Sequence, residues 1–463
     1  MAEIDAKLFK KYDIRGRAEG DDAPLTPAAA RLIGKAFGTY LDRVVGLQKV
    51  VVGRDNRRSS PALAQALIEG LQSSGCAVID IRMTSTPIVY WHAVSEGSIG
   101  GVMVTGSHLA PDQNGFKLCV GARNIYGDHI QALRLMIEDE DFNGGYEMVS
   151  VNESALVDYI VGVVPRLRMT RALHIVVDGG NGTGGAFGPR LLKAWGHRVT
   201  ELFCELDGSY PNHQPDPQDA DNLRALADTV REVGADVGIA FDGDADRMGV
   251  VDEQGTIIGA DRVLALLACD MLRRHPGAKV VANVLSSQVL FDEVARAGGM
   301  PIMWASGHSL IKAKMAEVGA LIGGEMSGHI FLAEDYYGFD DAYVAAARLL
   351  QLVGTAQVPL SLLNAKIPTL YSTPEYRPHC PDDLKDTVIA AVKAALEGQG
   401  EVTSIDGIRV RFDRGWGLLR ASNTEPVLSM RFEGETDADA IGYRDLFFTE
   451  LRSFPQIELA DVM

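Results

Sequence analysis

The sequence predicts an α/β protein with three similar α/β domains, each built on a mixed sheet, and a C-terminal α+β domain, arranged around a central cleft. Three observations support this. The chain has 463 residues, which is too many for one hydrophobic core. A strand–turn–helix–strand pattern occurs three times, and the last hundred or so residues follow a different pattern. We place the domains at residues 1–150, 151–255, 256–367 and 368–463.

The first repeat begins with an apolar run at residues 50–52, which predicts a buried strand ending in a polar turn. Ser60 at the N-cap and Pro61 at the first helical position predict a helix start. Leucines at 63, 67 and 71 form one apolar face, and Gly75 ends the helix. Residues 77–81 then predict the next strand.

The same order recurs twice, first from residue 174 to residue 203 and again from residue 279 to residue 304. Each of the three units is followed by a further apolar strand, at residues 101–104, 237–241 and 320–322. Polar loops come directly after these strands. Because open α/β sheets bind ligands at the carboxyl ends of their strands, we expect the three loops to line one site.

The last domain is predicted from an amphipathic helix at 382–397, two alternating strands at 408–412 and 428–432, and a final helix at 437–451. Gly415 and Gly417 are interpreted as the turn between the two strands. Strands with flanking helices are typical of an α+β domain.

Composition excludes several classes of partner. The net charge is −18, from 44 basic and 62 acidic residues, so the chain as a whole repels nucleic acid and anionic membranes. The 5 cysteines are scattered and form no CxxC pair, which indicates a reducing compartment and argues against structural zinc. No signal peptide and no apolar stretch of the ~20 residues needed to span a bilayer is visible. We therefore expect a cytoplasmic protein with no nucleic-acid or membrane partner.

Three aspartates, Asp242, Asp244 and Asp246, follow the strand at 237–241 with one small residue between each pair. In a tight loop their carboxylates can converge on one hard divalent cation, and an all-oxygen ligand set favours Mg²⁺. The alternative is a solvated acidic turn. Arg247, the next residue, could bind a phosphate oxygen beside the cation.

Ser107 lies in the loop Thr105-Gly106-Ser107-His108, after the strand at 101–104. A serine in a tripeptide such as Gly106-Ser107-His108 is more often a turn residue than a nucleophile. A serine phosphate beside a cation is nevertheless chemically reasonable, because the cation neutralises the charge during transfer.

Two further groups of side chains are candidate phosphate receptors. Each offers guanidinium, ammonium, hydroxyl or amide donors suited to a phosphate dianion. The first is Arg420, Ser422, Asn423 and Thr424, and the second is Tyr12, Arg15 and Lys117. Taken singly, each of these cations could instead be a surface salt-bridge partner.

Residues 180–185 match the GxGxxG pattern after a strand, and Glu201 lies near the spacing of a ribose-binding acid. One interpretation is a dinucleotide site, and the other is a glycine-rich turn of the second repeat. We favour the turn, because the other two repeats carry no glycine fingerprint.

Together these motifs resemble the α-D-phosphohexomutase family, in particular its bifunctional phosphomannomutase/phosphoglucomutase branch. The similarity extends over nearly the whole chain and in the same order. It comprises residues 12–16 (YDIRG), the phosphoserine loop at 105–111, the metal loop at 242–247, the sugar-specificity loop at 324–329 and the phosphate-binding loop at 420–426. Residues 114–117 and 307–309 also fit.

The resemblance implies roles for individual residues. Ser107 would be phosphorylated and, with Asp242, Asp244 and Asp246, would bind Mg²⁺. The catalytic residues would be Ser107, His108, Lys117, Arg15, Arg247 and His329. The substrate would be bound by Tyr12, Arg15, Lys117, Gly307, His308, Glu325, Ser327, His329, Arg420, Ser422, Asn423 and Thr424. Glu325 and Ser327 would hydrogen-bond sugar hydroxyls.

The family's reaction converts a hexose 1-phosphate, of glucose or mannose, into the 6-phosphate. Phosphoserine gives its phosphate to the substrate, and the resulting 1,6-bisphosphate turns around and returns its other phosphate to Ser107. The resemblance thus implies an isomerase of carbohydrate metabolism with phosphosugars as its small-molecule partners. Glucose 1,6-bisphosphate would be an activator, and a monomer is expected.

Two departures from the family's pattern matter. Leu109 and Ala110 replace Asn and Pro after the Ser-His pair, which predicts a working but slower site, and Leu285 stands where the family commonly has a Lys. Two alternatives therefore stay open, a phosphoglucosamine mutase and a catalytically weakened sugar-phosphate-binding protein. Met326, where phosphoglucosamine mutases typically have Gln, favours the glucose/mannose branch.

Overall fold

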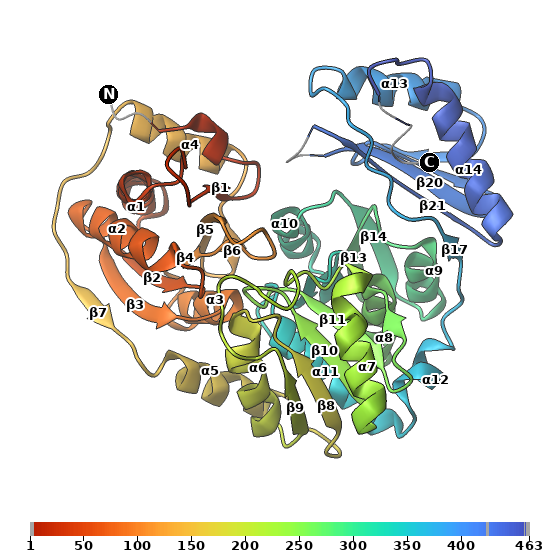
Figure 1. Ribbon diagram of the computed structural model, residues 1–463, viewed down its shortest axis with the longest axis horizontal. Coiled ribbons are helices and arrows are strands. Elements are labelled where there is room, and N and C mark those ends of the chain that lie inside the picture. The colour runs from red at the N-terminus through yellow and green to blue at the C-terminus, as the bar shows by residue number, and fades with distance from the viewer. Residues whose placement is uncertain (1–3, 423–425, 458, 460–463) are drawn as a thin grey trace.

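The computed structural model describes residues 4–422, 426–457 and 459, and it divides them among four separate sheets (Figure 1). Three sheets mix parallel and antiparallel pairs and the fourth is antiparallel, as the predicted fold class requires. The predicted boundaries near 150, 255 and 367 stay predictions. Within the described residues no helix is long and apolar enough to cross a membrane.

Domain I contains a 7-stranded sheet in the order β1-β5-β4-β2-β3-β7, with β6 paired to β5. Helix α2 begins at Ser60, so its N-cap is Ser59 and not Ser60 as predicted, because the Ser60 hydroxyl is bonded to Asp55. The elements are β1 (Ile14–Arg17), α1 (Pro27–Tyr40), β2 (Lys49–Arg54), α2 (Ser60–Ser73), β3 (Ala77–Met83), α3 (Thr86–Ser95), β4 (Gly100–Val104), β5 (Gln113–Val120), β6 (Arg123–Asn124), α4 (Asp128–Glu138) and β7 (Val149–Val151).

Domain II contains a 5-stranded sheet in the order β12-β11-β10-β8-β9. Its central strands are buried along their whole length, as expected for a sheet covered by helices. The elements are α5 (Ala155–Val163), β8 (His174–Asp178), α6 (Thr183–Ala194), β9 (Arg198–Leu202), α7 (Arg224–Val233), β10 (Val237–Phe241), β11 (Met248–Asp252) and β12 (Ile257–Ile258).

Domain III contains a 4-stranded sheet in the order β14-β13-β15-β16. In all three domains the strand that follows the repeat unit lies between a parallel and an antiparallel neighbour, which confirms the predicted repeat. The elements are α8 (Ala260–Arg274), β13 (Lys279–Asn283), α9 (Gln288–Arg296), β14 (Met300–Trp304), α10 (His308–Val318), β15 (Ile322–Gly324), β16 (Ile330–Leu332), α11 (Ala342–Ala356) and α12 (Leu360–Asn364).

Domain IV contains an antiparallel sheet in the order β17-β21-β20-β19-β18 with two helices. The interpretation of Gly415 and Gly417 as a turn is wrong, because both lie inside β20 and the turn falls at residues 413–414. The elements are β17 (Tyr371–Ser372), α13 (Lys385–Ala395), β18 (Glu401–Thr403), β19 (Ile408–Phe412), β20 (Gly415–Ala421), β21 (Leu428–Gly434) and α14 (Asp437–Leu451).

One apolar cluster joins the first three domains, and domain IV has a core of its own. Tyr90, Phe241 and Tyr343, one from each of domains I to III, belong to the shared cluster. Domain IV, blue in Figure 1, contacts domain III through a small apolar cluster that includes Val284 and Trp416. Domains I to III therefore share a buried core, whereas domain IV is attached through a smaller interface.

Candidate active site

The three predicted loops begin at the carboxyl ends of β4, β10 and β15, and contacts between them bring them together. A Cβ at Gly243 would lie 2.3 Å from the backbone oxygen of Ser107, so only glycine allows the first two loops to approach so closely. The backbone N–H of Met248 donates to the Gly328 oxygen at 3.2 Å and ties the second loop to the third. The three loops therefore lie together, and that they line one ligand site stays a prediction.

Ser107 lies where domains I and II meet. Its side chain is buried, and its Oγ donates to Asp242 Oδ2 at 2.8 Å and lies 3.2 Å from His108 Nδ1. Its φ of 51° places it in the left-handed region, which is uncommon for a residue with a Cβ. Burial, with the nearby charges of Arg247 and Arg15, holds the pKa of His108 well below its usual range, so the imidazole beside Ser107 is neutral.

The carboxylates of Asp242, Asp244 and Asp246 are fully buried, and one ligand atom from each lies within 4.8 Å of the others. Ala245, at φ 59°, turns the backbone so that the three side chains converge. Oδ1 of Asp244 and Oδ1 of Asp246 have no hydrogen-bond partner among the described residues. Buried acceptors without donors are costly, and an all-oxygen set of this kind fits a hard divalent cation.

Burial raises the pKa of Asp242 well above its usual range, and the neighbouring carboxylates raise it further. Lys117, on β5 beside β4, compensates part of this negative charge: its Nζ donates to Asp244 Oδ2 at 2.6 Å and also to Asp246. Burial lowers the pKa of Lys117, but the carboxylates outweigh burial and hold it above the ordinary value. Lys117 is therefore a charged ammonium in contact with the candidate metal ligands.

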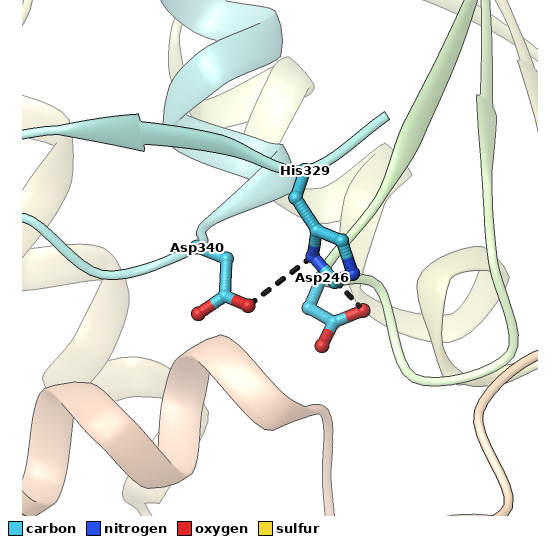
Figure 2. A group of neighbouring side chains, drawn as sticks. All are labelled: Asp246, His329 and Asp340. Atoms are coloured by element: carbon cyan, nitrogen blue, oxygen red, sulfur yellow. Dashed lines mark ion pairs between the residues drawn. The ribbon is translucent and has the colours of Figure 1, made fainter. Parts of the chain in front are cut away.

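Arg247 and His329 connect the second and third loops. Arg247 Nε donates to His329 Nε2 at 3.0 Å, so the proton of a neutral His329 lies on Nδ1. That nitrogen faces two carboxylates (Figure 2), at 3.2 Å from Asp340 Oδ2 and 3.8 Å from Asp246 Oδ1. Asp246, His329 and Asp340 are also close enough together to hold a metal. A protonated Nδ1 cannot ligate, so the arrangement favours an oriented imidazole over a second metal site.

Glu325 and His308 lie in the part of the site formed by domain III. Glu325 Oε1 accepts from the backbone N–H of Gly307 at 2.7 Å, and burial raises the pKa of Glu325. The His308 ring stacks on His329 with centroids 5.3 Å apart, and burial lowers the pKa of His308 to about 4. Ser327 is half-buried in the same loop as Glu325. These side chains place neutral nitrogens and a buried carboxyl where a sugar can hydrogen-bond.

Tyr12 of domain I reaches domain III. Its hydroxyl donates to the Ser306 oxygen at 2.9 Å, and a Cβ at Gly307 would lie within 2.7 Å of its ring. Burial, followed by the charge of Asp406, raises the pKa of Tyr12, so the phenol stays protonated. Arg15, half-buried on β1, donates to Asp13 beside the strand that carries Lys117.

Arg420 of domain IV lies near Tyr12 and donates from Nε to Asp406 Oδ2 at 2.9 Å. The same carboxylate oxygen accepts from the backbone N–H of Ser306 at 3.0 Å. The Ser422 oxygen accepts from Lys385 Nζ at 3.0 Å. Asn423 and Thr424, also predicted to bind phosphate, lie outside the described residues.

The glycine-rich segment at residues 180–185 is a packed turn. A Cβ at Gly182 would lie 2.8 Å from the Cα of Gly243, and the Thr183 N–H donates to the Gly243 oxygen at 3.0 Å. The start of α6 therefore packs against the loop that carries the three aspartates, which agrees with the favoured interpretation of a structural turn.

Several residues that contact the site were not predicted, among them Arg57, Thr86, Asp340 and Asp406. Thr86 donates its backbone N–H to the Asp244 oxygen at 3.0 Å and its hydroxyl to the Asp244 carboxylate. Arg57 follows β2 at the same sheet edge as Ser107, so its position after a strand was a usable signal. Asp406 lies in domain IV and does not follow a repeated strand, so no local pattern predicted its place in the site.

The fold and this site define a class of protein: a four-domain α/β protein in which a buried serine hydroxyl adjoins three converging carboxylates. The chain belongs to the phosphoglucomutase/phosphomannomutase family. Its alpha/beta/alpha domains I, II and III match residues 6–144, 157–255 and 259–371, and its C-terminal domain matches residues 379–449.

Relatives match over nearly the full length. A phosphoglucomutase of Neisseria gonorrhoeae is 42% identical, with 99% of each chain covered. A phosphomannomutase/phosphoglucomutase of Pseudomonas aeruginosa is 43% identical, with 97% of this chain and 96% of the relative covered. The crystal structure of a family member from Burkholderia thailandensis superimposes with a TM-score of 0.92 at 40% identity, covering 98% of this chain and 99% of the other.

Proposed function

We propose that this chain is an isomerase that interconverts the 1-phosphates and 6-phosphates of glucose and mannose through phosphoserine 107 and a hexose 1,6-bisphosphate. The observation that carries the proposal is the Ser107 hydroxyl, buried and 2.8 Å from Asp242 in the carboxylate cluster. Near relatives named phosphoglucomutase and phosphomannomutase/phosphoglucomutase support it.

Asp242, Asp244, Asp246 and a phosphate oxygen on Ser107 would hold one divalent cation, with Mg²⁺ favoured by the all-oxygen set. When bound, the cation supplies positive charge that stabilises the phosphate during transfer. Lys117, bonded to Asp244 and Asp246, would release these carboxylates to the cation and turn its ammonium toward the phosphate.

The remaining residues bind, orient and hold protons. Glu325, Ser327 and His308 would bind sugar hydroxyls, while Arg420, with Tyr12 and Arg15, would bind the phosphate that is not being transferred. His329 would accept the proton of the reacting sugar hydroxyl at Nε2, once the hydrogen bond from Arg247 opens, and would later return it, while Asp340 faces Nδ1; Lys117 or Arg15 could assist. His108, neutral and 3.2 Å from Ser107 Oγ, is placed to hydrogen-bond the phosphoserine.

The partners of this site would be cytoplasmic phosphosugars, with glucose 1,6-bisphosphate as the activator that primes Ser107. A monomer is proposed, as the family resemblance implies.

A coupled assay with glucose 1-phosphate, mannose 1-phosphate and glucosamine 1-phosphate, primed with glucose 1,6-bisphosphate, tests the proposal. We expect turnover of the first two and little of the third, because Met326 stands where a glutamine is typical of glucosamine-specific enzymes. Preference for glucosamine 1-phosphate would replace the proposal with a phosphoglucosamine mutase. Binding of all three without turnover would indicate a sugar-phosphate-binding protein.

A further inference from the structure

Arg57, in the loop between β2 and α2, lies fully buried beneath the loop that carries Ser107. Its Nη2 donates to the backbone oxygens of Ser107 and Leu109, each at 2.7 Å. Its Nη1 donates to the Gln113 oxygen at 3.0 Å and also to the Ala110 oxygen. One guanidinium thus holds four carbonyl groups from residues 107–113.

The charge of Arg57 is compensated by Asp55. Asp55 Oδ2 lies 3.2 Å from Arg57 Nε and accepts the backbone N–H of Gly106 at 3.2 Å, so the ion pair also includes the residue before Ser107. Tyr210 of domain II covers the guanidinium, with its ring centroid 5.0 Å from Cζ. A Cβ at Gly106 would lie 2.5 Å from Arg57 Cζ, so glycine there is needed for the guanidinium to fit.

Arg57 supplies polar contacts that the side chains of the Ser107 loop do not make. Leu109 and Ala110 offer no polar groups, and Ser107 has a left-handed backbone that needs outside support. A guanidinium can donate five hydrogen bonds in a fixed plane, which suits converging carbonyls, whereas a lysine ammonium has three donors and a different shape.

We propose that Arg57 is a positioning residue that fixes the Ser107 hydroxyl, and its phosphate, in line for transfer. This role rests on the proposed function, because it has meaning only if phosphate moves through Ser107. Arg57 would act through the backbone of the loop, without contacting the substrate.

The test is Arg57→Lys in the full-length protein. A misplacement of about 1 Å at a reacting group can cost about 100-fold in rate, so we expect kcat to fall by roughly that factor. The KM for glucose 1-phosphate should stay within about threefold, since Arg57 touches no predicted substrate-binding group. The rate of phosphate transfer from glucose 1,6-bisphosphate to dephosphorylated Ser107, followed by rapid quench and intact mass, should fall in parallel with kcat.

Leu133→Ala is the matched control. Leu133 is buried in the core of domain I on α4, so its truncation destabilises the same domain without touching the Ser107 loop. Its thermal midpoint should fall while the transfer rate on the folded enzyme stays near that of the native protein. Equal loss of transfer rate in Arg57→Lys and Leu133→Ala would reduce Arg57 to a structural role and overturn the proposal.

Gly106→Ala disturbs the contact between residue 106 and Arg57 from the loop side. It replaces Arg57→Lys as the test if that variant does not fold. Its new Cβ would lie 2.5 Å from Arg57 Cζ and 2.7 Å from the Gln113 oxygen that Arg57 binds, so it should displace the guanidinium from this oxygen and slow transfer without raising KM. In the double variant the two effects should be less than additive, because both act through one contact.

Fully additive effects of the two substitutions on the transfer rate would contradict the positioning role of Arg57. So would a transfer rate in Gly106→Ala equal to that of the native protein. Absence of phosphate on Ser107 in the native enzyme after incubation with glucose 1,6-bisphosphate would instead defeat the proposed function. A phosphorylated native enzyme with an unimpaired Arg57→Lys variant would defeat only the role of Arg57.

Discussion

At the scale of single residues, Ser107 combines a buried hydroxyl with a backbone in the left-handed region. Such a conformation costs about 1–2 kcal/mol in a residue with a Cβ, and it persists only where the surroundings impose it. Here the surroundings are Arg57, which holds the loop's carbonyl groups, and Asp242, which accepts the hydroxyl. The strain is therefore located at the group on which the proposed chemistry depends.

Asp244→Asn should weaken divalent-cation binding and lower kcat together, because it removes a charged oxygen from the cluster. Replacing even a partner of a metal ligand typically costs about 10- to 100-fold in affinity or activity, so we expect at least that loss for a ligand. Activity titrated against Mg²⁺ after EDTA treatment checks this. Asp221→Asn, at an exposed acid of the same domain, is the control and should change neither quantity. Full activity of EDTA-treated protein without added metal would show that no such site operates.

The double substitution Leu109→Asn with Ala110→Pro restores the family's loop, and the sequence predicts that it raises kcat. The structure limits the expected gain, because Arg57 holds the loop through the carbonyl groups of both residues and not through their side chains. We expect a rise of less than tenfold, which corresponds to less than about 1.4 kcal/mol of barrier. Steady-state kinetics with glucose 1-phosphate measure it. A larger rise would mean that the missing side chains, and not the backbone, limit the rate.

At the scale of elements, hydrophobic periodicity located the three repeated units and part of domain IV, but the sequence analysis made no prediction for elements such as β5, α8 and α11. The predicted bounds of β10 and β19 agree with the structure, as do those of α14. Strand β20 was missed because Gly415 and Gly417 look like turn residues. They are glycines because a Cβ at Gly415 would lie 2.0 Å from the Glu433 oxygen and one at Gly417 would lie 2.7 Å from Phe447. Such close approaches arise only in the tertiary structure.

The residues of the site also divide into those that a local sequence pattern predicts and those that only tertiary contacts bring in. Ser107, Asp242 and Glu325 could be predicted because each lies in a loop directly after a repeated strand, where local pattern is informative. Asp340 and Asp406 could not, because neither follows a repeated strand: Asp340 meets His329 where its segment folds back beside β16, and Asp406 contacts Ser306 of another domain. The assigned roles of the site residues stay predictions.

Arg420 and Asp406 form an ion pair that a substrate phosphate would have to displace. Arg420→Ala should chiefly raise the KM for glucose 1-phosphate, since it removes a contact made equally in ground and transition states. Asp406→Asn should act in the opposite direction and lower KM, because the amide oxygen still accepts the Ser306 N–H while the competing charge is gone. Steady-state kinetics of the two variants side by side provide the check. An unchanged KM in Arg420→Ala would remove Arg420 from the phosphate site.

At the scale of the whole molecule, the attachment of domain IV differs from that of the others. Arg262 Nη2 donates to the oxygens of Asn364 and Ile367, each at 2.9 Å, and Nη1 donates to that of Pro368 at 2.7 Å. The next anchored element, β17, already pairs with β21 of domain IV. The segment at residues 369–370 is therefore the short link at which we expect domain IV to turn, close to the predicted boundary near residue 367.

Domain IV should rotate about residues 369–370 when a sugar phosphate binds, because Arg420 must reach a ligand that enters between the domains. Small-angle scattering with and without glucose 1,6-bisphosphate should show a more compact particle with ligand. In Arg420→Ala the change should be smaller, since the domain loses its hold on the phosphate. Crystal structures with domain IV in one orientation in both states would argue against a hinge.

The central claim is that phosphate passes through Ser107, and intact mass with peptide mapping after incubation with glucose 1,6-bisphosphate tests it most directly. We predict a single phosphate on the peptide that contains Ser107, lost and regained during turnover of glucose 1-phosphate. The Ser107→Ala variant should take up no phosphate there and lose most of its activity. Phosphate on another residue, or full turnover by Ser107→Ala, would contradict the mechanism.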